Sequence, residues 1–338
     1  MPPDRSTQPA ATDAVIRAQG VTKRFDRFTA VDEVSLDIHR GEVFGLIGHN
    51  GAGKSTLFKM MLGLLAPTSG SIHIAGEPVD GAGAREVRRR IGYLPENVAL
   101  WDNLNGLETL RFFARLKRID TSTCAALLER VGLGHAGNRP VRAYSKGMRQ
   151  RLGFAQALLG QPQVLFLDEP TTGLDPRAIH FFWDTLAELR EQGLTIVLTS
   201  HILAELQNRV DRVAVLTNGK LQALGSLPEL RAQFDLPLRV RAQLAPATAA
   251  ADATRLLADL PPPLAGIARQ TEADAITFQA PRAHKIPLLQ YLLRQPGQVL
   301  DVHVQEPSLE DMFFADQAPA TEPASPVVAS DASQAEAA

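Results

Sequence analysis

The string GLIGHNGAGKST at residues 45–56 constrains this chain more than any other feature. Within it, Gly48, Gly53, Lys54 and Ser55 have the spacing GxxxxGK[ST], directly after an apolar segment and before a helical pattern. Glycines let backbone N–H groups turn inward, and a helix N-terminus carries about half a positive charge. The string therefore predicts a loop that cradles a polyanion; the alternative is an ordinary glycine-rich turn capped by a helix.

The side chains of this loop indicate nucleotide phosphates as the polyanion. The Lys54 ammonium can neutralise the terminal phosphates, and the Ser55 hydroxyl is placed to bind Mg²⁺. The residues expected to surround the phosphates are Gly48, His49, Asn50, Gly51, Ala52, Gly53, Lys54, Ser55 and Thr56.

A phosphate loop also needs carboxylates that hold the metal and order water, and VLFLDEP at residues 164–170 supplies two. Asp168 ends an apolar run and is expected at the carboxyl end of a buried strand. Adjacent side chains of a strand point oppositely. Because the chain leaves the strand here, Glu169 can turn toward the γ-phosphate as general base while Asp168 addresses Mg²⁺ through water. The alternative is that both carboxylates cap the next helix.

The composition favours a globular protein of a reducing compartment. Hydrophobic residues make up 45% of the 338 residues, enough to bury a core. Lys and Arg number 35 against 37 Asp and Glu, so nothing in the charge balance favours nucleic acid as a partner. Cys124 is the only cysteine, which excludes an internal disulfide. No run approaches the roughly 18–20 apolar residues that cross a bilayer, so we expect a cytoplasmic chain.

Changes of pattern along the chain predict two domains between two disordered tails, residues 1–13 and 317–338. Over residues 14–232, short apolar runs alternate with helical patterns, which predicts an α/β fold with a mostly parallel sheet and antiparallel strands at its edge. A helical insertion is expected at about 97–160. Residues 233–316 are expected to form a small separate α+β domain.

Further strings, in order along the chain, resemble the ATP-binding subunits of ABC transporters over about residues 14–230. YSKGMRQRLGFAQALL at 144–159 resembles the family signature, TGLD at 172–175 the D-loop, and LTSH at 198–201 the segment that carries the switch histidine. The resemblance implies a P-loop ABC-type nucleotide-binding domain, ATP and Mg²⁺ as ligands, and ATP hydrolysis.

The resemblance also implies roles for single residues. Phe25, in KRFDR, matches the aromatic residue that stacks on adenine; the alternative is a core residue of a strand. Ser145 and Gly147 precede a helix and would clamp the γ-phosphate of the partner subunit across a homodimer. Asp175 would lie at the seam of that dimer. His201 would contact the γ-phosphate and position water, and otherwise is a surface or core histidine.

Three positions depart from the commonest family pattern. Lys146 stands where glycine is usual and Met148 where glutamine is usual. Glu96, in GYLPEN, takes the position of the glutamine that links the metal to the permease. A carboxylate can still meet Mg²⁺ but cannot donate a hydrogen bond as an amide does. The alternative for Glu96 is a solvent-facing loop residue.

The resemblance implies a multi-spanning membrane permease as partner, on the inner face of the plasma membrane. SLEDMFF at 308–314 resembles the tail of ATPases that serve separate permeases, often drug exporters, although it also suits a capped helix. GHNGAGKST, GYLPENV and YSKGMRQRLGFAQALLG together resemble the ATPase of nitrous oxide reductase maturation, which serves copper-centre assembly through a permease and a periplasmic partner. A drug or lipid exporter remains the alternative, and from another class a soluble non-transport ABC ATPase.

Overall fold

The computed structural model describes residues 14–200, 206, 209–234, 237–245, 249–295 and 298–306. The chain forms two compact units that divide between residues 235 and 236. Both expected tails, His201 and the SLEDMFF string lie outside the described residues. No helix among the residues described has the length and apolar character needed to cross a membrane.

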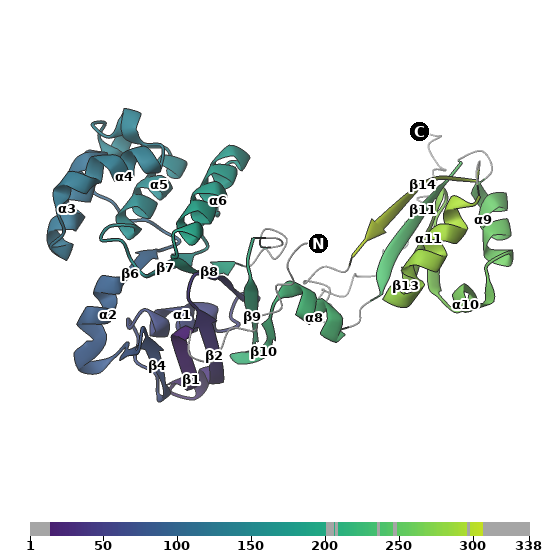
Figure 1. The fold of residues 1–338 in the computed structure, drawn as a ribbon, viewed down its shortest axis with the longest axis horizontal. Coiled ribbons are helices and arrows are strands. Elements are labelled where there is room, and N and C mark those ends of the chain that lie inside the picture. Colours follow the sequence, from purple (N-terminus) through teal and green to yellow (C-terminus); the bar gives the residue numbers. More distant parts are fainter. Residues whose placement is uncertain are drawn as a thin grey trace, which may run out of the picture. The chain divides into compact units, whose positions relative to one another are not determined.

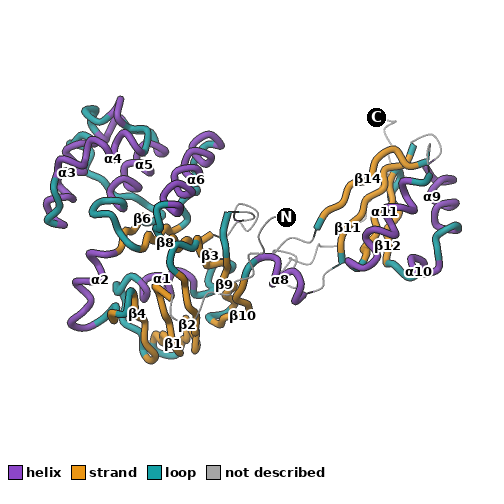
Figure 2. Tube along the Cα trace, in the orientation of Figure 1, coloured by secondary structure: helices purple, strands orange, loops and turns teal. Residues whose placement is uncertain are grey.

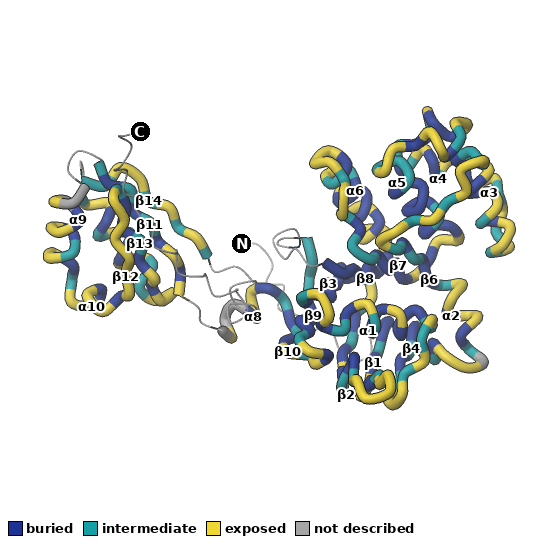
Figure 3. Tube along the Cα trace, turned by 180° about the vertical axis from the view of Figure 1, so that it is seen from behind, coloured by how far each residue is buried: buried dark blue, intermediate teal, exposed yellow. Residues whose placement is uncertain are grey.

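A six-stranded sheet forms the centre of the first unit (Figure 1). Its strand order is β10-β9-β3-β8-β7-β6, and all neighbours are parallel except β9 and β10. Its strands are β3 (Val43–Ile47), β6 (Ile91–Leu94), β7 (Val164–Asp168), β8 (Thr195–Ser200), β9 (Arg212–Thr217) and β10 (Lys220–Gly225). Strands β3 and β8 are buried along their whole length, as Figure 3 shows. Continuous apolar runs such as VFGLI suit parallel strands covered on both faces.

The antiparallel strands near the start of the chain form a sheet of their own. Its order is β2-β1-β4-β5, and its strands are β1 (Ala14–Phe25), β2 (Phe28–His39), β4 (Ser69–Ile74) and β5 (Glu77–Pro78). Helix α1 (Lys54–Met61) shares one hydrophobic core with both sheets, through residues that include Phe58 and Met60. The antiparallel edge of the parallel sheet is instead β10, which follows β9 through a tight hairpin.

Helices make up most of the chain between β6 and β7, and Figure 2 shows them apart from the strands. Within the described part of the first unit, the helices are α1, α2 (Ala84–Arg90), α3 (Gly106–Lys117), α4 (Cys124–Arg130), α5 (Lys146–Ala157), α6 (Pro176–Glu191) and α8 (Leu227–Phe234). Short 3₁₀ turns lie at η1 (Gly81–Gly83), η2 (Thr121–Thr123), η3 (Gly134–Ala136) and η4 (Val141–Ala143). Helix α3 begins with a capping box, in which Asn105 and Glu108 each accept a backbone N–H of the other.

The second unit is an antiparallel sheet of order β12-β13-β11-β14 with helices on one face (Figure 1). Its elements are β11 (Leu238–Leu244), α9 (Ala249–Ala258), α10 (Pro262–Ala265), β12 (Ala268–Thr271), β13 (Ala275–Ala280), η5 (Arg282–His284), α11 (Lys285–Leu293) and β14 (Val299–Gln305). Val240, Leu256, Phe278 and Leu288 belong to its separate core. The sequence patterns predict β11, β13, α11 and β14, whereas β12 is a fully exposed strand without an apolar signal.

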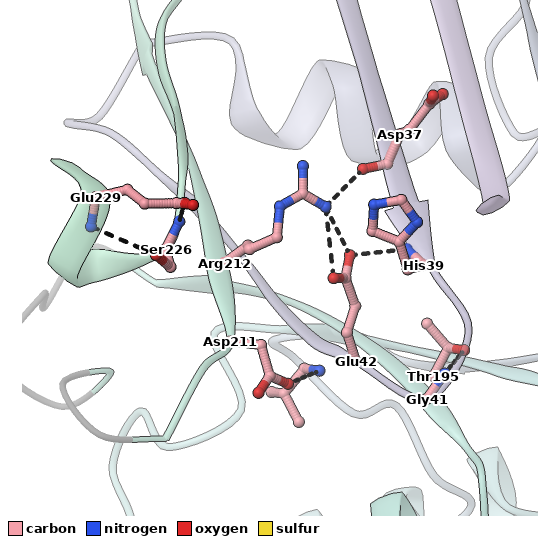
Figure 4. A network of polar contacts seen from close by, with 10 residues as sticks. Asp37, His39, Gly41, Glu42, Thr195, Asp211, Arg212, Ser226 and Glu229 are labelled. Carbon is pink, nitrogen blue, oxygen red and sulfur yellow. Dashed lines mark hydrogen bonds and ion pairs between the residues drawn. The ribbon is translucent and has the colours of Figure 1, made fainter. Parts of the chain in front are cut away.

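A buried polar network fixes the start of β3 against β9 (Figure 4). The Glu42 carboxylate accepts the backbone N–H of His39 at 2.8 Å and pairs with Arg212 at 3.3 Å. The Asp211 carboxylate accepts the backbone N–H of Val43 at 2.8 Å. Burial raises the pKa of Glu42 although the His39 N–H and the Arg212 guanidinium both act to lower it.

Candidate active site

The glycine-rich loop joins the end of β3 to the start of α1, as the sequence predicts. Gly53 is the N-cap of α1 and has a φ of 99°, a conformation that L side chains rarely adopt. A Cβ at this position would lie 2.5 Å from the carbonyl oxygen of Ala30. Only glycine therefore fits here, and the loop backbone packs directly on β2.

Two hairpins hold the loop from outside. The backbone N–H of Gly219, in the β9–β10 turn, donates to the carbonyl of Ala52 at 3.0 Å. The carbonyl of Gly219 in turn accepts the N–H of Asp32 on β2 at 2.9 Å. The β9–β10 turn therefore holds the loop directly and is itself bonded to β2.

Lys54 is the buried cation of the loop, only 7% exposed. Its Nζ donates to the backbone carbonyls of Gly48 and His49, the latter at 3.1 Å. Burial lowers the pKa of Lys54, while the carboxylates of Glu169 and Asp168 act to raise it. The lysine is therefore held in the loop and carries a charge that an anion would stabilise.

The two carboxylates leave the same edge of the sheet as the loop. Asp168 is the last residue of β7 and pairs in register with Thr199 of β8. β8 also pairs with β3, whose last residue begins the loop. Neighbouring strands lie about 4.8 Å apart, so one strand separates the loop from the carboxylates.

Thr199 joins the two carboxylate residues. Its Oγ1 donates to Oδ1 of Asp168 at 2.6 Å and accepts the backbone N–H of Glu169 at 3.0 Å. Glu169 has a φ of 46°, so the chain leaves the strand at this residue, as the sequence analysis expects. The N-cap of α6 is Asp175, whose side chain accepts the backbone N–H of Ala178. The alternative that Asp168 and Glu169 cap this helix is therefore wrong.

Two further residues lie near this edge. Glu96 is exposed and follows β6 by two residues, and β6 pairs with β7 up to Leu94 and Leu167. Glu96 therefore leaves the sheet on the side of the carboxylates. The sequence analysis did not identify Tyr93, whose phenol pKa is raised by burial and by the Asp168 charge. In the sequence, the place of Tyr93 in the GYLPEN string is the feature that indicates a position near the site.

Phe25 ends β1 with its side chain 45% exposed, so the alternative of a strand-core residue is wrong. The Nζ of Lys23 lies 5.3 Å from the centre of its ring. The exposed ring belongs to the sheet whose β2 packs on the phosphate loop. It is therefore open to a flat ligand beside that loop.

Ser145 and Asp175 each begin a helix. The Ser145 Oγ accepts the backbone N–H of Met148 at 3.3 Å, and a carboxylate oxygen of Asp175 accepts that of Ala178 at 2.8 Å. A Cβ on Gly147 would lie 3.7 Å from the Leu174 side chain. The two segments therefore touch within one chain.

The arrangement fits a nucleotide triphosphate with Mg²⁺. The loop offers a buried ammonium at the N-terminus of α1, and Ser55 is exposed there. Hydroxyl and carboxylate oxygens are the ligands that Mg²⁺ prefers. Ser55, Asp168 and Glu96 are therefore suited to hold the metal.

Comparison with known proteins agrees with this geometry. The family model described as ABC transporter matches residues 31–172. The daunorubicin resistance ATP-binding protein DrrA3 of Streptomyces coeruleorubidus is 37% identical over 315 residues, which cover 89% of this chain and 95% of that protein. This chain belongs to the ABC transporter ATP-binding proteins. As an ABC ATPase, it hydrolyses ATP.

Two further relatives each match about two thirds of this ABC ATPase. The human phospholipid-transporting ATPase ABCA3 is 41% identical over 220 residues, which make up 64% of this chain but only 13% of that protein. A solved structure of an ATP binding subunit of an ABC transporter is 32% identical and superposes with a TM-score of 0.61 over 65% of this chain and 93% of that one. The expected P-loop ABC fold is thereby confirmed.

Proposed function

We propose that this ABC ATPase dimerises around two MgATP and drives a membrane permease that serves copper-centre maturation of nitrous oxide reductase. The Thr199 hydroxyl is the main support for the proposed roles in ATP hydrolysis, because it fixes Asp168 and the backbone of Glu169 beside the buried Lys54. Asp168, expected to hold the metal, and the Glu169 carboxylate are thus presented together at the edge of the sheet where the phosphate loop begins.

Each side chain of the site has a part in this proposal. Lys54 holds the terminal phosphates, while Ser55 and Asp168 hold the metal, with Glu96 as a further oxygen ligand. Bound Mg²⁺ supplies neutralisation of phosphate charge. Glu169 accepts the proton of the attacking water. His201, which lies outside the described residues, orients that water.

The second nucleotide contact comes from a second copy of the chain. Ser145 is the N-cap of α5 and Gly147 its second residue, and this helix start offers its first N–H groups to the γ-phosphate held by the partner. Asp175 lies at the seam between the copies, and Phe25 stacks on the adenine. Closing and opening of this homodimer supplies the mechanical work.

A groove of about 500 Å³ is our candidate docking site for the permease. Five of its lining residues are cations: Arg85, Arg88, Arg89, Lys117 and Arg118. None of its lining residues is acidic, although the chain as a whole has a net charge of −2. Burial lowers the pKa of Lys117. Its Nζ donates a hydrogen bond to the Leu159 carbonyl at 3.3 Å. An acidic segment of the permease would complement this groove.

Apolar side chains continue the surface along α3. Leu116 lines the groove and is 65% exposed. One turn earlier Phe112 is also exposed, and its ring packs against Trp101 with 4.7 Å between ring centres. Exposed aromatic side chains beside a polar rim are typical of protein interfaces. We therefore expect an acidic and partly apolar cytoplasmic segment as the ligand of the groove, with the ATPase on the inner face of the plasma membrane.

The copper-maturation part of the proposal rests on the GHNGAGKST, GYLPENV and YSKGMRQRLGFAQALLG strings. In this account the metal passes through the permease to a periplasmic partner and never binds the ATPase. The alternative is a drug or lipid exporter, which the names of the daunorubicin resistance protein and the phospholipid-transporting ATPase favour.

Deletion of the gene tests these functions in the native host. The proposal predicts that nitrous oxide reductase accumulates without its copper centre and that a Lys54→Met copy does not restore it. Fully loaded reductase together with lost resistance to an amphipathic drug would instead establish the exporter. Purification of the tagged chain from solubilised membranes tests the soluble class, because recovery with ribosomes or nucleic acid in place of a permease would contradict both transport functions.

A further inference from the structure

Lys146, the first residue of α5, lies across Gly173 of the D-loop. A Cβ at Gly173 would meet the Lys146 Nζ and would lie 2.8 Å from its Cε and 3.2 Å from its Cδ. The last three atoms of the lysine side chain therefore cover the glycine. A lysine takes the place of the usual family glycine here, so this contact is a property of the present sequence.

Two further observations place the first turns of α5 against the loop that follows Glu169. The would-be Cβ of Gly147 faces Leu174 at 3.7 Å. The buried amide of Gln150 donates its Nε2 to the Pro170 carbonyl at 3.3 Å. Residues 146, 147 and 150 share one side of the helix. This side holds the loop from Pro170 to Leu174.

The same loop is bonded to the proposed general base. The backbone N–H of Thr172 donates to the carbonyl of Glu169 at 3.2 Å, and that of Leu174 donates to the carbonyl of Thr171 at 3.1 Å. Gly173 lies between these two turns with a φ of 75°. A shift of Gly173 therefore displaces Thr172 and with it the backbone of Glu169.

The charge of Lys146 gains nothing from its position at the start of α5. The N-terminus of a helix is its positive end, where a cation is unfavourable. Glycine at residue 146 would leave Gly173 uncovered by the lysine, because the neighbouring Gly147 has no side chain that could replace the lysine stem. The contact with Gly173 is the interaction of this side chain on which the inference is built.

We propose that Lys146 is a positioning residue, which fixes the D-loop through Gly173 and thereby holds Glu169 in place for hydrolysis. The inference rests on the proposed role of Glu169. Two of the three covering atoms, Cδ and Cε, are carbons of the lysine stem, so we expect the length of the side chain to matter more than its charge. Misplacement of a catalytic group by about 1 Å can lower a rate about 100-fold, so partial loosening of the loop should lower kcat by about 10-fold.

Steady-state hydrolysis of MgATP by the full-length protein tests the inference. Lys146→Gly is expected to lower kcat about 10-fold and to change KM for ATP by less than about 2-fold, because the phosphate loop is untouched. Lys146→Met and Lys146→Arg keep the stem and should restore most of the parental kcat. Melting temperatures are measured for all variants as well. A purely structural role of Lys146 would lower the melting temperature without lowering kcat selectively over KM.

A double-mutant cycle with Gly173→Ala isolates the contact. In the parental background, Gly173→Ala displaces the lysine and should lower kcat. In the Lys146→Gly background, the fold-decrease in kcat caused by Gly173→Ala should be smaller by a factor of at least about 3. Additive effects, or a parental kcat in Lys146→Gly, would overturn the inference. So would a raised KM with unchanged kcat, because Lys146 would then act on the phosphate of the partner. Absence of Mg²⁺-dependent hydrolysis in the parental protein would instead contradict the proposed function itself.

Discussion

The hydroxyl of Thr199 lies 2.6 Å from Oδ1 of Asp168, and the two residues face each other in register on β8 and β7. Thr199 is 1% exposed, so water does not compete for this bond. Because the same oxygen accepts the N–H of Glu169, one side chain fixes both residues that the proposed hydrolysis uses. The bond fixes the orientation of the carboxylate expected to hold the metal.

We predict that Thr199→Val lowers kcat about 10-fold and raises the Mg²⁺ concentration needed for half-maximal rate. The variant leaves a buried N–H and a carboxylate oxygen without a partner, which costs about 1–3 kcal/mol of stability. Thr199→Ser keeps the hydroxyl and should restore the Mg²⁺ dependence. Mg²⁺ titrations of ATPase rate measure both variants, and an unchanged Mg²⁺ requirement in Thr199→Val would separate Thr199 from the metal site.

Glu169→Gln should lower kcat by about 10² to 10⁴, because the amide cannot accept the proton of the attacking water. Phosphate release at saturating MgATP measures the effect. Glu188→Gln, on the exposed side of α6, is the matched control and should keep the parental rate. Parental turnover in Glu169→Gln would assign the general base to another residue.

The buried pair of Glu42 and Arg212 predicts a pH dependence of stability. The folded pKa of Glu42 is raised above its ordinary value of 4.5 by burial. Between these two values the folded state binds more protons than the unfolded state, so the free energy of unfolding falls as pH rises through this window. Glu42→Gln should remove this part of the fall.

Denaturant unfolding at several pH values measures this effect, followed by the fluorescence of Trp101 and Trp183, which both lie in the first unit. Arg212→Met removes a cation that acts to lower the pKa of Glu42, so it should move the fall to higher pH. Parallel curves for the parental protein and Glu42→Gln would show that Glu42 does not titrate in this window.

Charge reversal in the cationic groove should separate permease binding from hydrolysis. Arg85→Glu with Arg88→Glu is expected to abolish recovery of the permease from solubilised membranes, while the ATPase rate of the purified subunit stays within about 2-fold. Arg115→Glu changes an exposed arginine of α3 that does not line the groove and should leave recovery unchanged. If the double variant still recovers the full amount of permease, the permease binds a surface other than this groove.

The parts of the site within short strings could be predicted from sequence. Lys54 and Ser55 lie in one continuous motif, and Asp168 and Glu169 end an apolar run, so strand and loop chemistry fix their places. Thr199 could not be identified as their partner, because its bond to Asp168 depends on the pairing of β7 with β8. That pairing joins residues 31 positions apart and leaves no local pattern.

The arrangement of the strands was less predictable than their existence. The alternation of polar and apolar residues identifies β1 and β2 as strands but does not determine which sheet they join. In the structure they belong to a sheet separate from the parallel one. The same limit applies to the second unit, where the order β12-β13-β11-β14 follows from tertiary packing. Phe25 shows a related limit, because its exposure depends on the end of a hairpin and not on its apolar side chain.

Two MgATP held between two copies of the chain predict that nucleotide drives the association of the subunit. Light scattering after gel filtration of Glu169→Gln, with the bound nucleotide quantified, should give a monomer without nucleotide and a dimer with two ATP when MgATP is added. Lys54→Met in the same background should stay monomeric. A Glu169→Gln protein that binds no MgATP, or that binds it and remains a monomer in the presence of its permease, would contradict the account.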